Sequence, residues 1–82
     1  MKKFWYNKVI RLDSGEYKFA PIGDNEGSVT YDSISEMKRE LGKKYEFKEK
    51  DLVYHDGEYV STYIFFDRLS NTYIGVYKSL TD

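Results

Sequence analysis

The stretch GEYVSTYIFF, residues 57–66, decides the fold because it alternates two kinds of side chain. Successive side chains of an extended strand point to opposite faces of the sheet. One face of this strand would carry Val60, Thr62, Ile64 and Phe66. The other face would carry Tyr59, Tyr63 and Phe65. Because a sheet of this kind usually buries one face and exposes a polar one, the aromatic second face needs an explanation.

The residues around this stretch predict an antiparallel meander of three strands, at about 52–55, 58–67 and 72–78. Asp56-Gly57 is typical of a two-residue type I′ turn, which requires positive φ at both positions. That turn would place Tyr54 opposite Tyr59. The first hairpin of the meander is therefore well specified by the sequence.

The second turn decides which side chains share a face. A three-residue turn at 69–71, with Asn71 left-handed, would place Ile64 opposite Val76 and Tyr63 opposite Tyr77. A two- or four-residue loop would mix the sets, with Ile64 joining Tyr77. We expect the three-residue turn because it keeps each face uniform. The face under the helix would then carry Val53, Val60, Ile64, Phe66, Ile74 and Val76, and the opposite face Tyr54, Tyr59, Tyr63, Phe65, Tyr73 and Tyr77.

Two more strands are expected near the N-terminus, at 3–12 and 16–22, joined by a turn in which Gly15 takes positive φ. Pro21 lacks an amide donor and should lie at the end or edge of its strand. The segment LDSGEY, residues 12–17, echoes YHDGEY, residues 54–59. One shared Gly-Glu-Tyr tripeptide is typical of hairpins and does not indicate a repeat.

A helix is expected from about Ser33 to Leu41. Ser33 and Glu36 have the spacing of a capping box, and Asp32 is a rival N-cap. The apolar stripe consists of Ile34, Met37 and Leu41. Gly42 is placed to end the helix in the left-handed conformation.

The remaining segments are expected to be a polar loop at 23–28, a short extended piece at 45–47 and a charged turn at 49–51. The element order is then ββαβββ. The sequence predicts one small α+β domain over residues 1–82, with an antiparallel sheet and one helix packed on one face.

Composition indicates the cellular location and the type of organism to expect. The 82 residues include no cysteine, thirteen basic and fourteen acidic residues, and no apolar run long enough for a signal peptide or a membrane span. We expect a cytoplasmic protein with no membrane association. The many Lys, Tyr, Asn, Ile and Phe residues are typical of AT-rich coding sequence, as in low-GC bacteria and their phages.

Residues suited to catalysis are few. His55 is the only histidine, and its place in a turn favours a solvated or capping role over that of a general base. No phosphate-binding loop, nucleophile motif or metal-ligand spacing is visible. We therefore expect neither an enzyme nor a bound metal or cofactor.

Three explanations for the aromatic face remain open. The N-terminal hairpin could cover it with Trp5, Tyr6, Tyr17 or Phe19; a protein partner or a second copy could bind it; or bases of a single-stranded nucleic acid could stack on it. Nucleic acid is the less favoured because the chain has no basic excess.

The preferred hypothesis is a protein-binding module, such as a phage or mobile-element inhibitor that blocks a host defence or nucleic-acid-processing protein. The aromatic anchors would be Tyr54, Tyr59, Tyr63, Phe65, Tyr73 and Tyr77, and the polar rim would be Lys48, Asp51, Arg68 and Lys78.

Overall fold

Six strands and one helix make up the described part of the chain, which in this computed structural model is residues 1–20, 27–55 and 57–78. In chain order the elements are β1 (Lys2–Arg11), β2 (Tyr17–Phe19), β3 (Gly27–Tyr31), α1 (Ile34–Leu41), β4 (Glu46–His55), β5 (Glu58–Asp67) and β6 (Thr72–Lys78). The expected small α+β domain with an antiparallel sheet and one helix is confirmed in this coarse form. No helix within these ranges has the length and apolar character needed to cross a membrane.

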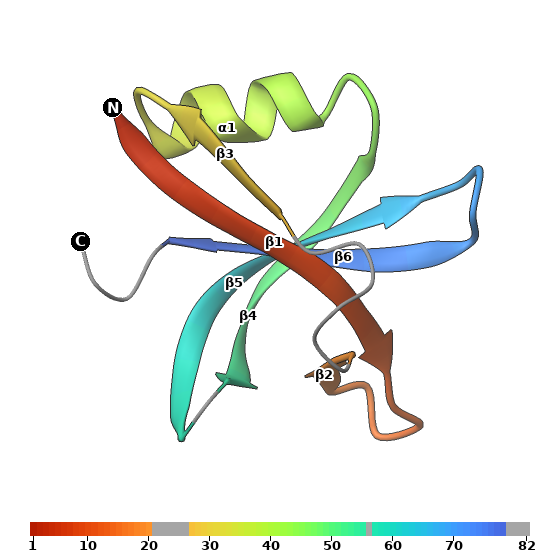
Figure 1. Cartoon of the computed structure of the whole chain (residues 1–82). Coiled ribbons are helices and arrows are strands. Elements are labelled where there is room, and N and C mark those ends of the chain that lie inside the picture. The colour runs from red at the N-terminus through yellow and green to blue at the C-terminus, as the bar shows by residue number, and fades with distance from the viewer. Residues whose placement is uncertain (21–26, 56, 79–82) are drawn as a thin grey trace.

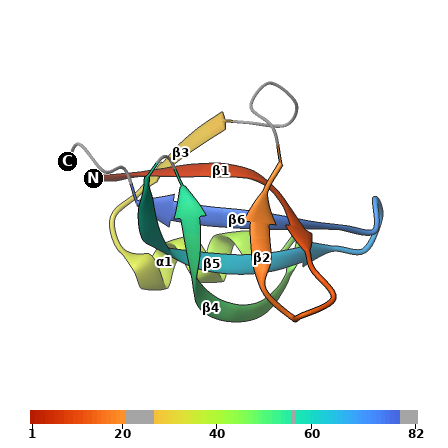
Figure 2. The same cartoon turned by 90° about the horizontal axis from the view of Figure 1, so that it is seen from below.

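The strands form one antiparallel sheet in the order β2-β1-β6-β5-β4. The long strand β1 pairs with β3 along its first half and with β2 along its second half. The sheet is strongly curled, and α1 lies across one side of it (Figure 1). Seen from below, the two end strands β2 and β4 run side by side in the same direction (Figure 2). No ladder joins them within the described residues, so the curled sheet has an open seam.

The register between β5 and β6 differs from the expected one by one residue. Ile64 lies opposite Gly75, and Phe65 lies opposite Ile74, because a four-residue loop connects the strands. Asn71 has the expected positive φ of 57°, but the turn that contains it is longer. The predicted uniform faces are therefore wrong, and each face of the sheet carries both aromatic and aliphatic residues.

Both faces of the sheet are covered, which explains why both are apolar. On the convex face, Met37 of the helix packs against Phe4, Phe65 and Val76. On the concave face, a second cluster consists of Val9, Tyr17, Val53 and Ile64, with Phe19 and Tyr73 packed against it. The helix therefore covers the face that carries Phe65, not the predicted face that carries Ile64.

The helix begins as expected, but its end differs. Ser33 is the N-cap, and its Oγ accepts a hydrogen bond from Glu36 N–H at 3.1 Å. Glu36 Oε2 in turn accepts one from Asp32 N–H at 2.9 Å, which completes a reciprocal cap. Gly42 has φ of −66°, so the predicted left-handed end is wrong. Its N–H continues the helical pattern by bonding Lys38 O at 2.9 Å.

Two strands of the structure also differ from the prediction. The strand β3 was absent from the predicted ββαβββ order, although Val29 and Tyr31 pack on the helix-side core. Residues 49–51 are not a turn but the middle of β4, which runs unbroken past a bulge at Lys48. Charged residues fit there because β4 is an end strand, where charge discourages pairing with other chains.

The two hairpins β1–β2 and β4–β5 agree with the predictions from the sequence. Gly15 has φ of 91° in the β1–β2 turn, and Gly57 has φ of 91° before β5. Tyr54 lies opposite Tyr59, as the two-residue turn requires. The expectations for Pro21 and for the loop at 23–26 concern residues outside the described ranges, whereas 27–28 open β3.

The curled sheet leaves no room for a side chain at Gly75, and a substitution there tests this close packing. A Cβ at this position would lie 2.9 Å from both Thr62 Cγ2 and Val9 Cγ1, and 3.1 Å from Phe19 Cε1. Gly75→Ala should therefore lower the free energy of unfolding by about 1–3 kcal/mol, measured by urea denaturation. Thr62→Ser removes the opposing methyl and keeps the hydroxyl that bonds Val60 O. The double variant should lose less than the sum of the single losses, and strict additivity would contradict the proposed close contact.

Candidate binding groove

A hollow on the described surface lies along the seam, on the side of the molecule opposite the helix. It is a groove of about 500 Å³ between the β1–β2 hairpin and the strand pair β4–β5. We call it the seam groove. Its lining residues are Leu12, Glu16, Tyr17, Lys18, Phe19, Asp51, Leu52, Tyr54, His55 and Tyr59.

Backbone groups of both end strands point toward the seam. On β2, the bonds Leu12 N–H to Glu16 O (2.8 Å) and Ala20 N–H to Lys8 O (2.9 Å) fix the pairs that face β1. Because an antiparallel ladder alternates, Tyr17 and Phe19 direct their N–H and C=O groups away from β1. The seam is therefore walled on this side by an unpaired strand edge.

The same alternation applies to β4. The pair His55–Glu58 adjoins a two-residue connection and so exchanges hydrogen bonds, which leaves the backbone of Leu52 and Tyr54 directed away from β5. Consistently, the N–H of Leu52 is satisfied by the neighbouring Asp51 Oδ1 at 2.8 Å. Asp51 thus covers one donor of an otherwise open edge.

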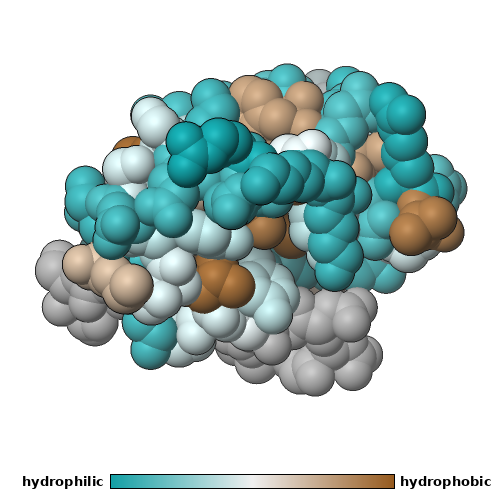
Figure 3. Space-filling view, turned by 90° about the horizontal axis from the view of Figure 1, so that it is seen from above, coloured by the Kyte–Doolittle hydropathy of each residue, from teal (hydrophilic) through white to brown (hydrophobic). Residues whose placement is uncertain are grey.

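The walls of the groove carry large apolar side chains that face solvent. Leu12 is 41% exposed on one wall, and Leu52, Tyr54 and Tyr59 are 63%, 58% and 71% exposed on the other. The rings of Tyr54 and Tyr59 meet edge to face with centroids 5.4 Å apart, which holds them as one unit. By contrast, the surface seen from the helix side is mostly hydrophilic, with hydrophobic residues only in small separate areas (Figure 3).

Three packed rings lie at and beneath the floor of the groove. Phe19 lies 5.1 Å from the ring of His55, and Tyr77 lies 5.1 Å from His55 and 5.3 Å from Phe19. Tyr77 Oη and His55 Nε2 are 3.3 Å apart, within hydrogen-bond distance. His55 is half-buried, so it packs against these rings and still lines the groove.

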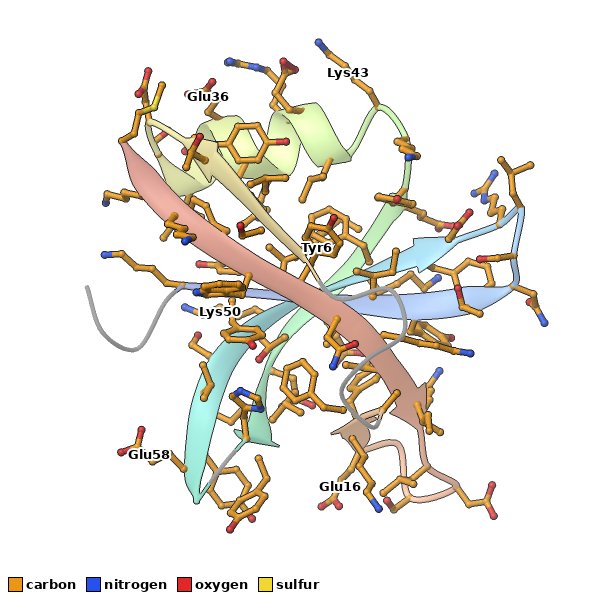
Figure 4. All side chains as sticks on the ribbon, viewed as in Figure 1. Tyr6, Glu16, Glu36, Lys43, Lys50 and Glu58 are labelled. Atoms are coloured by element: carbon orange, nitrogen blue, oxygen red, sulfur yellow. The ribbon has the colours of Figure 1, made fainter. Side chains whose placement is uncertain are left out.

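The groove is bordered by more acidic than basic groups. Glu16, Asp51 and Lys18 line it, and exposed Glu58 stands next to the β5 wall opposite His55. Figure 4 shows Glu16 and Glu58 at the same end of the molecule, far from the helix residues Glu36 and Lys43. Within the described ranges, none of these three carboxylates forms an ion pair. The groove therefore presents negative charge that is available to a bound molecule.

The sequence-predicted aromatic anchors do not form one surface. Phe65 is fully buried beneath the helix, and Tyr77 is 5% exposed. Tyr73 packs against Tyr17 with centroids 5.6 Å apart, so the explanation in which the N-terminal hairpin covers the aromatic residues holds for Tyr73 and Tyr77. Of the six predicted anchors, only Tyr54 and Tyr59 are exposed.

Tyr63, the remaining anchor, is half-buried on the helix side. Lys38 Nζ lies 4.3 Å from the centroid of Phe47 and 6.0 Å from that of Tyr63. Lys50 Nζ lies 5.6 Å from the Tyr63 ring. Lysines therefore occupy the face of this ring, and a partner would have to displace them to reach it.

The predicted polar rim is also dispersed. Arg68 bonds Glu46 Oε2 through Nε and a terminal nitrogen at 3.1 and 2.9 Å, and Lys48 lies 3.5 Å from the same carboxylate. Arg68 lowers the pKa of Glu46, chiefly through these hydrogen bonds. This group lies at the end of β4 remote from Tyr54, and Lys78 ends β6. Among the four rim residues, only Asp51 lines the seam groove.

Most of the lining residues were absent from the predicted site. On the β1–β2 hairpin they are Leu12, Glu16, Tyr17, Lys18 and Phe19, and on β4 they are Leu52 and His55. A signal for them was present in the echo between LDSGEY and YHDGEY. Gly15 and Gly57 share the same φ. Glu16 and Tyr17, which follow Gly15, line one wall of the groove, and Tyr59, which follows Gly57, lines the other. The shared Gly-Glu-Tyr tripeptide is typical of hairpins, as expected. Because each hairpin forms one wall of the groove, the tripeptide also places similar residues on both walls.

Tyr17 connects the seam to the concave core. Its hydroxyl donates to Glu49 Oε2 at 3.0 Å, across the seam from β2 to β4. Burial, followed by this hydrogen bond, raises the pKa of Tyr17 to about 12. Within the described residues no three His, Asp or Glu side chains gather as metal ligands. The Tyr17–Glu49 hydrogen bond therefore holds β2 against β4 at this part of the seam.

Tyr17 should make stability depend on alkaline pH. Its raised pKa means that the folded state keeps the phenol proton, so this contribution is complete below pH 10 and is lost between pH 10 and about 12. Thermal melts should show a steeper loss of Tm with pH in this range for the wild type than for Tyr17→Phe. Parallel curves for the two proteins would show that Tyr17 ionises as it does in the unfolded chain.

The exposure of each tyrosine predicts how much stability its replacement by alanine should cost. Tyr54→Ala and Tyr59→Ala should each lower the free energy of unfolding by about 1 kcal/mol, mainly through loss of their mutual ring contact. Tyr77→Ala empties a buried site and should cost about 3 kcal/mol or more. Denaturant titration of the three variants makes the comparison, and a large loss for Tyr54 or Tyr59 would show that these rings serve the core.

Known proteins supply no template for this groove. No protein-family model matches the chain, and no curated protein or solved structure is significantly similar to it. Any function must therefore be argued from the groove itself, which combines exposed rings, unpaired strand edges and negative charge.

Proposed function

We propose that the protein is a non-enzymatic binding module that holds another protein in the seam groove. The observation that carries this proposal is the exposed Tyr54–Tyr59 pair, which forms one wall of the groove together with Leu52. Tyrosine contributes large contact area with few rotatable bonds and keeps a hydrogen-bonding end, so it is common at the centre of interfaces. The site is narrower than the predicted tyrosine face and adds Leu12 from the opposite wall.

The surrounding charges favour a protein over a nucleic acid as the partner. Bases could stack on Tyr54 and Tyr59, but the phosphates would then approach Glu16, Asp51 and Glu58. Single-strand binders instead lay the phosphate backbone along a positive groove. Lys18 is the one lysine that lines the seam groove. Single-stranded nucleic acid therefore remains the alternative that this site supports less well.

Blocking the surface of a partner protein is the mode of action that fits an exposed groove of this kind. Two small clusters form the core of the described residues, and four of the large apolar side chains that stay exposed, Leu12, Leu52, Tyr54 and Tyr59, line the groove. Such a module acts by occupying a partner's surface, by steric or allosteric inhibition. The AT-rich residue usage fits a phage or mobile-element inhibitor of a host protein, as proposed from the sequence.

The proposal is tested by comparing the proteins captured by two variants. Tyr54→Ser/Tyr59→Ser removes both rings from the groove wall, whereas Leu69→Ser removes a side chain that is 97% exposed on the β5–β6 loop. Each immobilised variant is incubated with candidate host extracts, and retained proteins are quantified by mass spectrometry. A genuine partner should be retained by the wild type and by Leu69→Ser and lost from the double variant, since each hot-spot ring contributes about 2 kcal/mol.

The same comparison can contradict the proposal. If every retained protein is kept equally by the wild type and the double variant, the groove is not the binding surface. Circular dichroism of the double variant must first show the native spectrum, so that loss of binding reports the missing rings and not unfolding.

A further inference from the structure

We infer that the seam groove binds an extended polypeptide segment that carries lysine or arginine side chains and pairs with the edge of β4. The inference rests on the proposed function, which it makes specific by naming the chemistry of the bound segment. Three features of the groove support it: its shape, its backbone edges and its charge.

The shape fits an extended chain. The groove runs along β2 and β4, which lie side by side in the same direction (Figure 2). From Asp51 to His55 its β4 wall covers four residue steps, or about 13 Å at about 3.3 Å per residue. A helix is about 10 Å wide with its side chains and needs a broader apolar trough than one wall of Leu52 and Tyr54 provides. A strand of roughly four residues matches this length.

The backbone edges supply the hydrogen bonds that a strand requires. Leu52 and Tyr54 direct their peptide groups toward the seam from β4, and Tyr17 and Phe19 do so from β2. Because β2 and β4 already touch across the seam, an added strand would bond the β4 groups through its own backbone, as in other cases of strand addition to a sheet edge. The main chain then supplies affinity without regard to sequence, and the side chains supply selectivity.

The charges specify which side chains fit. In an extended segment alternate side chains point to opposite sides, so one set can pack between Leu12 and the Tyr54–Tyr59 pair. The other set meets Asp51 and Glu58, and Glu16 borders the apolar set beside Leu12; none of the three carboxylates has an ion-pair partner within the described residues. Lysine or arginine at these positions supplies the missing positive charge, whereas an acidic segment would be repelled.

Asp51 connects the charge to the backbone edge. Its carboxylate bonds the N–H of Leu52 at 2.8 Å, and this bond shields the edge in the free protein. A cationic side chain in the groove would draw the carboxylate into an ion pair and release the N–H for a carbonyl of the bound segment. A basic segment therefore frees the N–H of Leu52 more readily than a neutral one does.

The experiment uses the full chain labelled with ¹⁵N and three synthetic peptides followed by NMR chemical shifts. The first peptide is Lys-Val-Lys-Phe-Lys-Val, the second replaces each lysine with glutamate, and the third is the basic peptide with N-methyl groups on alternate residues. Shifts are measured at 50 and 300 mM salt. Groove binding is expected to move the amide signals of Leu52, Tyr54, Tyr17 and Phe19, with the basic peptide binding at least tenfold tighter than either control.

Variants then separate specific pairing from general charge attraction. Glu16→Gln/Glu58→Gln should weaken binding of the basic peptide about three- to tenfold and keep the fold, because both side chains are exposed. Glu36→Gln/Glu40→Gln on the helix is the matched control and should leave the affinity unchanged. Asp51→Asn should weaken the preference for the basic over the acidic peptide.

Several results would overturn the inference. Equal binding of the N-methylated and unmodified basic peptides would exclude edge pairing, and absence of peptide-induced shifts up to millimolar concentration would exclude the extended segment. Tighter binding of a twelve-residue oligothymidine at these amides would assign the groove to nucleic acid. Shifts that grow with protein concentration alone would assign it to a second copy. If the peptides fail while capture still depends on Tyr54 and Tyr59, the proposed function stands and only this inference falls.

Discussion

The rest of the structure depends on the close packing around Gly75, at the centre of the curled sheet. Thr62 of β5, Val9 of β1 and Phe19 of β2 all approach the position where a side chain would stand. Only a residue without a Cβ lets three strands curve this tightly around one point. That curvature brings β2 over the concave core and alongside β4. The missing side chain at Gly75 thus permits the close approach of strands from which the seam and the groove follow.

The aromatic content follows from the same geometry. A chain of 82 residues with a covered sheet must fill two thin cores from few side chains, one under the helix and one inside the curl. Large rings fill such cores with few residues. Tyr17 and Tyr77 are thus structural, and their hydroxyls reach Glu49 and His55. The exposed pair Tyr54–Tyr59 differs from these tyrosines because neither ring packs in either core cluster.

An open seam is a risk as well as an opportunity. Unpaired strand edges recruit other chains, and proteins usually protect them with charge, bulges or short strands. All three devices are present here: β2 has three residues, β4 has a bulge at Lys48, and Asp51 covers the N–H of Leu52. The same acidic protection that prevents unselective pairing would favour a segment able to neutralise it. Protection and selectivity thus come from one set of carboxylates.

The sequence by itself determined the local structure. Hairpin glycines, the Ser33 cap and the bounds of β5 and β6 depend on contacts between near neighbours, and these predictions were confirmed. The face on which each tyrosine lies was decided only by the tertiary structure, because a loop longer by one residue moves every side chain of a strand to the other face. The groove could not be read from the sequence for a related reason. Its two walls come from hairpins some forty residues apart, and only the curl of the sheet at Gly75 brings them together.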